Sequence, residues 1–156
     1  MAWRGVKFPG IPSSRTGHNN MKKLDKPQLE RLSQFRYQLR RFLRFSEDAA
    51  LEAGLTLLQY QLLLHTQGIE GRNWASIGEL AERLQAKPHG VVALVTRCEA
   101  AGLVSRKGHA NDGRIVEVHL TPLGSQALQQ VALRHESELG NRARILVQAS
   151  PAAGER

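Results

Sequence analysis

Two short amphipathic segments separated by a break of three residues constrain this fold more than any other feature. Ser76-Ile77-Gly78-Glu79 has the pattern of a capping box, in which a hydroxyl begins a helix and a carboxylate three residues later completes the cap. After the break at residues 85–87, Pro88 suits the first turn of a second helix. The apolar positions recur at helical spacing in both segments: Ile77, Leu80, Ala81 and Leu84, then Val91, Leu94, Val95 and Cys98. Two short helices with a tight turn between them predict a helix-turn-helix.

The residues that follow predict a β-hairpin and then a long helix. Gly102 ends the second short helix, and residues 103–107 form a candidate strand. Residues 108–113 are rich in turn formers, and residues 114–120 alternate between apolar and polar side chains, as a half-buried strand does. Thr121-Pro122 supplies a cap and a proline for a last helix that we expect to reach about residue 147.

The part of the chain before residue 76 predicts two further helices. From Pro27, apolar residues recur in steps of three and four, which indicates a first helix over about residues 27–53 that stops at Gly54. Thr56 caps a second helix over residues 57–67, which is apolar on several sides and therefore predicted to be buried. Residues 1–26 are predicted to be a flexible basic arm and residues 150–156 a frayed tail.

Composition sets the class of protein and the range of partners. A chain of 156 residues fits one domain, no apolar run reaches the roughly 18 residues of a membrane helix, and a single cysteine excludes an internal disulfide framework. A cytoplasmic protein without membrane partners is the expectation. The net charge of +8 favours a polyanionic partner, but residues 1–46 carry a balance of +9 and residues 47–156 a balance of −1. The total charge is therefore only indirect evidence for nucleic acid.

Four short motifs follow one another in a fixed order along the chain. They are Ile77-Gly78-Glu79-Leu80-Ala81, then Ala100-Ala101-Gly102-Leu103-Val104-Ser105-Arg106, then Asp112-Gly113-Arg114, and last Leu120-Thr121-Pro122-Leu123-Gly124. With these motifs the chain resembles the multiple-antibiotic-resistance regulators, the MarR family, and the resemblance spans roughly residues 29–147. It implies a mainly α-helical winged helix-turn-helix with a small β-hairpin wing. The domain would span residues 27–149, with a DNA-binding core over about residues 56–120 and dimerisation helices over about residues 27–53 and 122–147.

The resemblance also implies a function. The protein would be a homodimeric transcription regulator, of the repressor type that is common in the family, and would bind a palindromic double-stranded DNA operator. The helix at residues 88–101 would enter the major groove and the wing would reach the minor groove. Many members are released from DNA by a small phenolic or aromatic acid, or by oxidation, so a small-molecule effector is a candidate partner.

The predicted DNA contacts lie on the wing and on the second short helix of the helix-turn-helix, which is called the recognition helix below. The helix-turn-helix itself starts at the cap Ser76. An α-helix fits the major groove and reads base edges from its N-terminal part. The exposed positions of the recognition helix are predicted to be Lys87, Pro88, His89, Gly90, Val92, Ala93, Thr96 and Arg97. The family usually has Ser, Thr or Arg where this chain has Gly90, Val92 and Ala93. We therefore expect fewer direct base contacts and more reliance on DNA shape.

On the wing, Arg114 is the strongest candidate, because a narrow A·T minor groove attracts an inserted guanidinium. Asp112 is placed either to orient this arginine or only to form a surface ion pair with it. The other predicted wing contacts are Arg106, Lys107 and Asn111.

The remaining candidate residues each have a functional and a purely structural interpretation. Arg36 and Arg40 are four residues apart and could hold a carboxylate in a ligand cleft near Trp74, although a solvated helix face and a core tryptophan are the ordinary alternatives. Cys98 is predicted to be a buried structural thiol. The six histidines show no zinc-site spacing, so no metal or other cofactor is predicted.

Catalysis is not expected, because the sequence has neither a nucleophile elbow nor a Gly-rich phosphate loop. No catalytic residue is therefore assigned. The alternative to DNA binding is a winged helix that binds another protein through its weakly polar recognition helix.

Overall fold

The computed structural model describes residues 23–110 and 112–149, with side chains described as far as residue 138. The elements in chain order are α1 (Lys26–Glu52), α2 (Leu57–Gln67), β1 (Trp74–Ser76), α3 (Ile77–Arg83), α4 (Pro88–Ala100), β2 (Val104–Gly108), β3 (Val116–Leu120) and α5 (Pro122–Ala149). The mainly helical fold class is confirmed. None of the described helices is long and apolar enough to cross a membrane.

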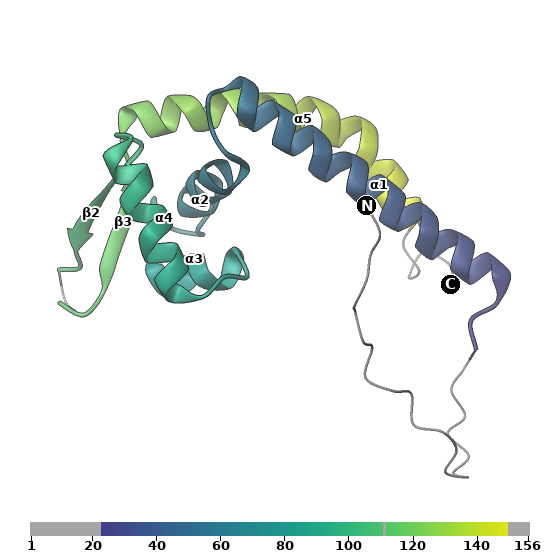
Figure 1. The fold of residues 1–156 in the computed structure, drawn as a ribbon, viewed down its shortest axis with the longest axis horizontal. Coiled ribbons are helices and arrows are strands. Elements are labelled where there is room, and N and C mark those ends of the chain that lie inside the picture. Colours follow the sequence, from purple (N-terminus) through teal and green to yellow (C-terminus); the bar gives the residue numbers. More distant parts are fainter. Residues whose placement is uncertain (1–22, 111, 150–156) are drawn as a thin grey trace, which may run out of the picture.

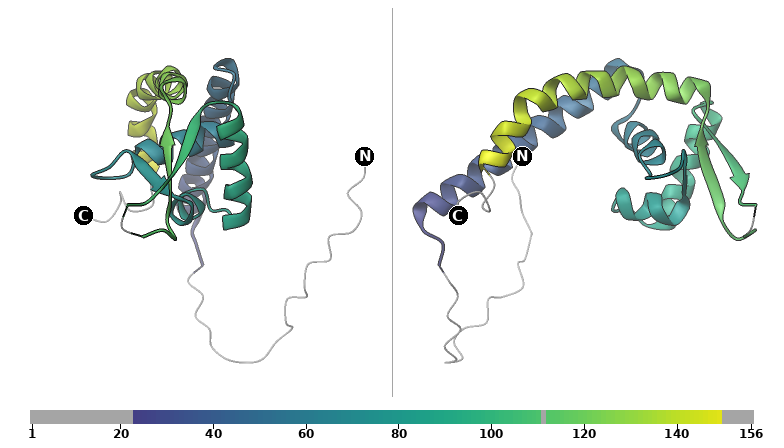
Figure 2. Two further views of the ribbon diagram at one scale, coloured as in Figure 1. Left: turned by 90° about the vertical axis from the view of Figure 1, so that its left-hand side faces the viewer. Right: turned by 180° about the vertical axis from the view of Figure 1, so that it is seen from behind.

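The elements form a compact lobe and a long helix pair. Figure 1 shows the lobe, built from α2, α3, α4 and the sheet, below the start of α5. Helices α1 and α5 lie side by side and extend well beyond the lobe, and Figure 2 shows the same arrangement from two other sides. In these views α3 and the tip of the β2–β3 hairpin lie on the side of the lobe away from α5.

Three of the helices begin with a complete capping box. Ser76 and Thr56 are the caps that the sequence predicts, and their hydroxyl oxygens accept hydrogen bonds from the backbone N–H of Glu79 and Gln59. The first helix begins one residue earlier than predicted, because Asp25 caps it and Gln28 closes the box. The break between α3 and α4 lies where the sequence places it, and there Gln85 adopts a positive φ of 50°.

A three-stranded antiparallel sheet connects the helix-turn-helix to the hairpin, in the order β1-β3-β2. The hairpin is predicted by the sequence, but β1 is not. Its three residues pair with β3, with Ala75 opposite Val118, and on the other side of β3 Arg106 lies opposite Val118. Ala75 and Val118 are completely buried, so this face of the sheet packs on the core. A segment as short as β1 shows no alternation of its own, and only its pairing with a distant strand identifies it.

The hairpin, or wing (residues 104–120), is joined to α5 by a tight connection. The Thr121 hydroxyl donates to the carbonyl of Gly102 and accepts from the N–H of Gly124, while the Thr121 N–H donates to the carbonyl of Leu103. A Cβ on Gly124 would lie 1.9 Å from the Leu103 carbonyl oxygen. The Leu-Thr-x-x-Gly pattern therefore has a physical basis: the threonine caps α5, and the glycine lets α5 pass against the backbone of Leu103, which directly precedes the wing.

Where α5 crosses α1 and α2, a buried histidine takes part in the core. His135 is 6% exposed, and its ring stacks on Tyr60 with 4.9 Å between ring centroids. Its Nδ1 lies 2.9 Å from the Val131 carbonyl oxygen, and its Nε2 lies 2.8 Å from the Ser46 hydroxyl of α1. A polar contact thus joins the two long helices at the point where they meet the lobe.

Candidate nucleic-acid interface

Helix α4 has one buried face and one exposed face, as predicted. Val91, Leu94, Val95 and Cys98 are buried against the lobe. All eight predicted recognition residues are exposed: Lys87, Pro88, His89, Gly90, Val92, Ala93, Thr96 and Arg97. Within the described parts of the chain, no hydrogen bond or ion pair engages the side chains of Lys87, His89 or Arg97. These three side chains can therefore bind another molecule without breaking a contact of this chain.

Thr96 and Arg106 are exceptions among the predicted contact residues, because each is bound within the chain. The Arg106 guanidinium donates to the Thr96 hydroxyl at 2.6 Å and to the Val92 carbonyl at 3.2 Å. The Thr96 hydroxyl in turn donates to the Val92 carbonyl. Glu99 of α4 forms an ion pair with the same guanidinium at 3.4 Å. Sequence reasoning missed this group, because nothing local relates β2 to one face of α4.

At the tip of the wing, Asp112 both orients Arg114 and pairs with it. The carboxylate accepts hydrogen bonds from the backbone N–H of Arg114 at 3.0 Å and from its Nε at 3.2 Å. The side-chain hydrogen bond from Arg114, followed by the backbone one, holds the pKa of Asp112 below its usual range. The Arg114 side chain is nevertheless 92% exposed. It is thus directed by a charged partner while its guanidinium remains accessible.

The other wing residues are placed as follows. Lys107 is exposed on β2 opposite Glu117 of β3, and Asn111 lies outside the described residues. The turn is closed by a hydrogen bond from the Ile115 N–H to the Asp112 carbonyl and by one from the His109 N–H to the Ile115 carbonyl. These contacts keep the tip compact next to Arg114.

The start of the helix-turn-helix is held by a charge network that the sequence indicated only in part. Glu79 accepts hydrogen bonds from the backbone N–H and the hydroxyl of Ser76 and forms an ion pair with Arg72. Burial alone would raise the pKa of Glu79, but the Ser76 and Arg72 contacts outweigh burial and lower it. The Arg72 guanidinium also lies 3.9 Å from the centroid of the Trp74 ring, a cation–π contact. The sequence singled out Trp74 but not Arg72.

The three residues predicted for a ligand cleft are not brought together in the described chain. Trp74 is half-buried, lies opposite His119 of β3, and contacts Arg72 and the ring of His109. Arg36 and Arg40 are exposed on α1, and no contact among the described residues joins either arginine to Trp74. A carboxylate held by the two arginines stays a prediction.

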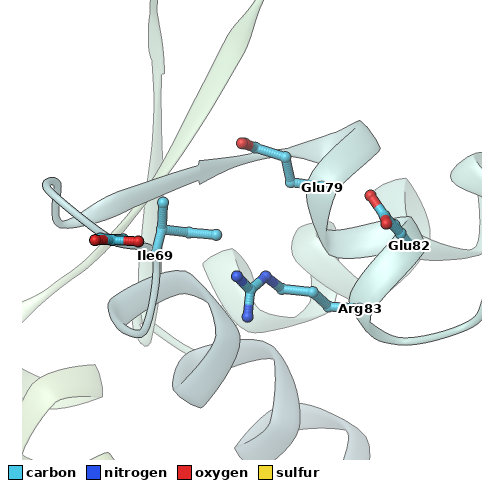
Figure 3. A pocket seen from close by; sticks show the side chains of 5 residues that line it. Ile69, Glu79, Glu82 and Arg83 are labelled. Carbon is cyan, nitrogen blue, oxygen red and sulfur yellow. The ribbon is translucent and has the colours of Figure 1, made fainter.

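An open pocket of about 350 Å³ lies elsewhere, between the α2–β1 loop and α3. Figure 3 shows Arg83 reaching from α3 towards Ile69 of the α2–β1 loop, with Glu79 and Glu82 on the same wall as Arg83. Glu70 completes the lining. Because three carboxylates face one arginine, this pocket is poorly suited to the aromatic acids that the resemblance implies as effectors.

Cys98 and the side chains that could bind a metal ion are placed as follows among the described residues. Cys98 is completely buried, and burial raises the pKa of its thiol, which disfavours the reactive thiolate. No group of three or more His, Cys, Asp or Glu side chains is placed to bind a metal ion in residues 23–110 and 112–149.

The comparisons with known proteins agree with this geometry. Residues 53–115 match the sequence model of the MarR family. No curated protein matches the chain. The crystal structure of AbsC, a MarR family transcriptional regulator from Streptomyces coelicolor, is similar with a TM-score of 0.66 at 22% identity, covering 85% of this chain and 87% of AbsC.

Two further solved structures show the same fold. Wild-type MarR from E. coli in its apo form has a TM-score of 0.60 at 18% identity, covering 84% of this chain and 89% of MarR. The M. tuberculosis transcriptional regulator MOSR, solved in complex with DNA, has a TM-score of 0.52 at 25% identity, covering 69% of this chain and 77% of MOSR. By sequence over residues 53–115 this chain is similar to the MarR family, and over most of its length it has the winged-helix fold of the solved MarR family transcriptional regulators.

Proposed function

We propose that the protein is a sequence-specific DNA-binding transcription regulator that acts as a homodimeric repressor. The observation that carries this proposal is the wing tip, where Arg114 is 92% exposed but directed by Asp112. A guanidinium that is oriented and accessible on a projecting hairpin suits insertion into a narrow minor groove. Its exposure does not suit a buried structural role.

The exposed face of α4 supports a second contact with DNA, in the major groove. Its exposed face offers Lys87 and Arg97 to phosphates or guanine edges and His89 to a base edge. Gly90 and Ala93 add an apolar surface that can touch a thymine methyl, but they have no side-chain group that donates or accepts a hydrogen bond. We infer that base reading by this helix is sparse and that DNA shape contributes much of the specificity.

A second copy of the chain would cover apolar side chains on the helix pair. Leu29, Leu32, Tyr37 and Leu43 are exposed on α1, which extends beyond the lobe. A two-fold dimer would place two lobes on one face of the DNA, so the operator would be palindromic with half-sites about one helical turn, roughly 34–36 Å, apart. Repression would follow where such a site overlaps a promoter, and release by a small aromatic acid rests on the family resemblance.

The experiment that tests this function is selection of binding sites from random duplex DNA, followed by competition with nonspecific duplex. We expect a palindromic site whose affinity falls steeply with salt, because phosphate contacts release counterions. Arg114→Ala should weaken binding to this site by roughly 1–3 kcal/mol without unfolding the protein.

The matched control is Arg31→Ala, which removes an exposed arginine of α1 away from the wing and outside the predicted ligand cleft. It should leave the affinity of the selected site nearly unchanged. If no site is enriched, or if Arg114→Ala binds the selected site as tightly as wild type, the proposed mode of DNA binding is wrong. A flat salt dependence would favour the alternative, a winged helix that binds another protein.

A further inference from the structure

The Arg106 side chain binds one face of α4 through both terminal nitrogens of its guanidinium. Its Nη2 donates to the Thr96 hydroxyl and to the Val92 carbonyl, and its Nη1 lies 3.4 Å from Oε2 of Glu99. The other carboxylate oxygen of Glu99 accepts a hydrogen bond from the Arg106 backbone N–H at 3.2 Å. Glu99 thus holds both the main chain and the side chain of one β2 residue. We call these four residues, Val92, Thr96, Glu99 and Arg106, the wing clamp.

The three α4 residues of the wing clamp share one helical face. They follow one another at spacings of four and three residues, which places them in a single stripe along the helix. The Arg106 and Glu99 side chains are 31% and 40% exposed, so the ion pair is only partly screened by solvent. The wing clamp therefore connects the middle of the recognition helix to the middle of the first wing strand.

The position of the clamp matters because β1 and Trp74 hold the wing on its β3 side, whereas the clamp holds it to α4 on its β2 side. Val104 and Val118 are buried against the core at the inner end of the hairpin. Lys107, Gly108 and Val116, further out, are exposed. Across this distance the wing clamp is the polar connection from the described wing to α4. It fixes the angle between the strand that leads to Arg114 and the helix that would enter the major groove.

We propose that Arg106 is a positioning residue that sets the wing relative to the recognition helix, and that it does not bind a DNA phosphate. This inference rests on the proposed function. A guanidinium that already donates to a hydroxyl, a carbonyl and a carboxylate would have to give up those partners to reach a phosphate. Holding α4 and the wing tip at a fixed separation lets both grooves be contacted at once, without ordering the wing on binding.

Removing the charge of Glu99 tests the proposal, because the wing clamp and general electrostatics predict opposite changes in DNA affinity. Glu99 is an acidic residue on the recognition helix, so general electrostatics alone predicts that removing its charge strengthens binding to DNA. If the wing clamp positions the wing, Glu99→Gln weakens binding instead. The loss expected for a partly exposed ion pair with its hydrogen bonds is about three- to tenfold in Kd.

The experiment measures operator binding by wild type, Glu99→Gln, Arg106→Ala and the control Glu82→Gln, at several salt concentrations. Glu82 is an exposed carboxylate of α3 outside the wing clamp. All measurements are made at a temperature where circular dichroism shows every variant to be folded. Glu99→Gln and Arg106→Ala should both bind more weakly, and Glu82→Gln should bind as well as wild type or better. The slope of log K against log salt should stay that of wild type in Arg106→Ala.

Two DNA readouts would overturn the proposal. If Arg106 bound a phosphate, the variant Arg106→Ala would show a salt slope smaller by about 0.9 for each phosphate that it no longer neutralises, and Arg106 would be a DNA ligand. Tighter binding by Glu99→Gln would show that the Glu99 charge acts only by repulsion. Hydroxyl-radical footprints add a spatial test: we expect the minor-groove protection under the wing to fade in both clamp variants while methylation protection of guanines under α4 persists.

A measurement on the free protein separates this inference from the proposed function. Amide hydrogen exchange in residues 105–108 and 116–118 should be faster in Glu99→Gln and Arg106→Ala than in wild type and Glu82→Gln. If wild type has no operator, the proposed function fails and exchange alone decides whether the clamp holds the wing. If exchange in the wing is the same in all four proteins, the wing clamp is wrong.

Discussion

At Gly124 the first turn of α5 passes against the backbone of Leu103 with no room for a side chain. Alanine at this position would place its Cβ 1.9 Å from a carbonyl oxygen, and backbone on both sides cannot move as a flexible side chain could. We expect Gly124→Ala to lower the free energy of unfolding by about 2 kcal/mol or more, as overpacking does. Chemical denaturation at a fixed protein concentration measures this change.

Gly78 provides the control for that prediction, because it is a helical glycine with open space around it. Nothing lies within 4 Å of a Cβ built on Gly78. Gly78→Ala should therefore raise the free energy of unfolding by about 0.5–1 kcal/mol through helix propensity. Equal effects of the two substitutions would show that the close approach at Gly124 does not limit stability.

At the scale of residues, the sequence predicts best where the partner is a few positions away. The caps at Thr56 and Ser76 are predictable because a capping box is complete within four residues. The network around Arg106 is not, because its partners lie 7 to 14 residues away on another element. Helical periodicity predicts the exposed positions of α4, but not which of them are already occupied by the wing.

Between elements, the contact of Ser46 with His135 joins α1 to α5. A carbonyl can only accept, so Nδ1 of His135 donates to Val131 and, in the neutral ring, Nε2 accepts from the Ser46 hydroxyl. Ser46→Ala would leave Nε2 buried without a partner beside Tyr60. We expect a loss of about 1–3 kcal/mol in the free energy of unfolding, measured by chemical denaturation.

Ser137→Ala is the matched control on α5, since the Ser137 hydroxyl donates to a carbonyl at an exposed position. Its effect should stay within about 0.5 kcal/mol. If Ser46→Ala is as mild as Ser137→Ala, the polar contact between the long helices contributes little. The sequence could not indicate this pair, because 89 residues separate its members.

Helices and strands, like single residues, are predicted well where the signals that form them lie close together in the sequence. The helices and the hairpin are predicted close to their observed bounds, since each has its own periodicity and its own start signals. The strand β1 is missed because it has three residues and exists only by pairing with β3. That pairing also determines where Trp74 lies, opposite His119 of β3 and away from the arginines of α1.

At the scale of the whole molecule, we predict that Leu32 lies in the interface with a second copy of the chain. Leu32 is 42% exposed on α1 beyond the lobe, and a charge there would be buried unpaired in the proposed dimer. Leu32→Glu should shift the protein towards monomer in sedimentation equilibrium and abolish cooperative binding to a full palindrome. Binding to a single half-site should persist weakly.

Leu58→Glu tests whether any exposed leucine would do the same, because Leu58 is 51% exposed on α2 in the lobe. It should leave the oligomeric state unchanged. A wild-type protein that sediments as a monomer at micromolar concentration would refute the dimer, and equal dissociation by both substitutions would place the interface elsewhere.

Local signals in the chain establish the helices, the hairpin and the family resemblance, because periodicity, caps and turn residues act over a few positions. Which exposed side chains remain accessible depends on tertiary packing alone. That packing leaves Arg114 accessible at the wing tip and binds Arg106 to α4, although both are arginines of one predicted wing. The physical reason is that hydrogen bonds and ion pairs depend on the relative placement of elements, and that placement follows from burial of the whole core rather than from local pattern.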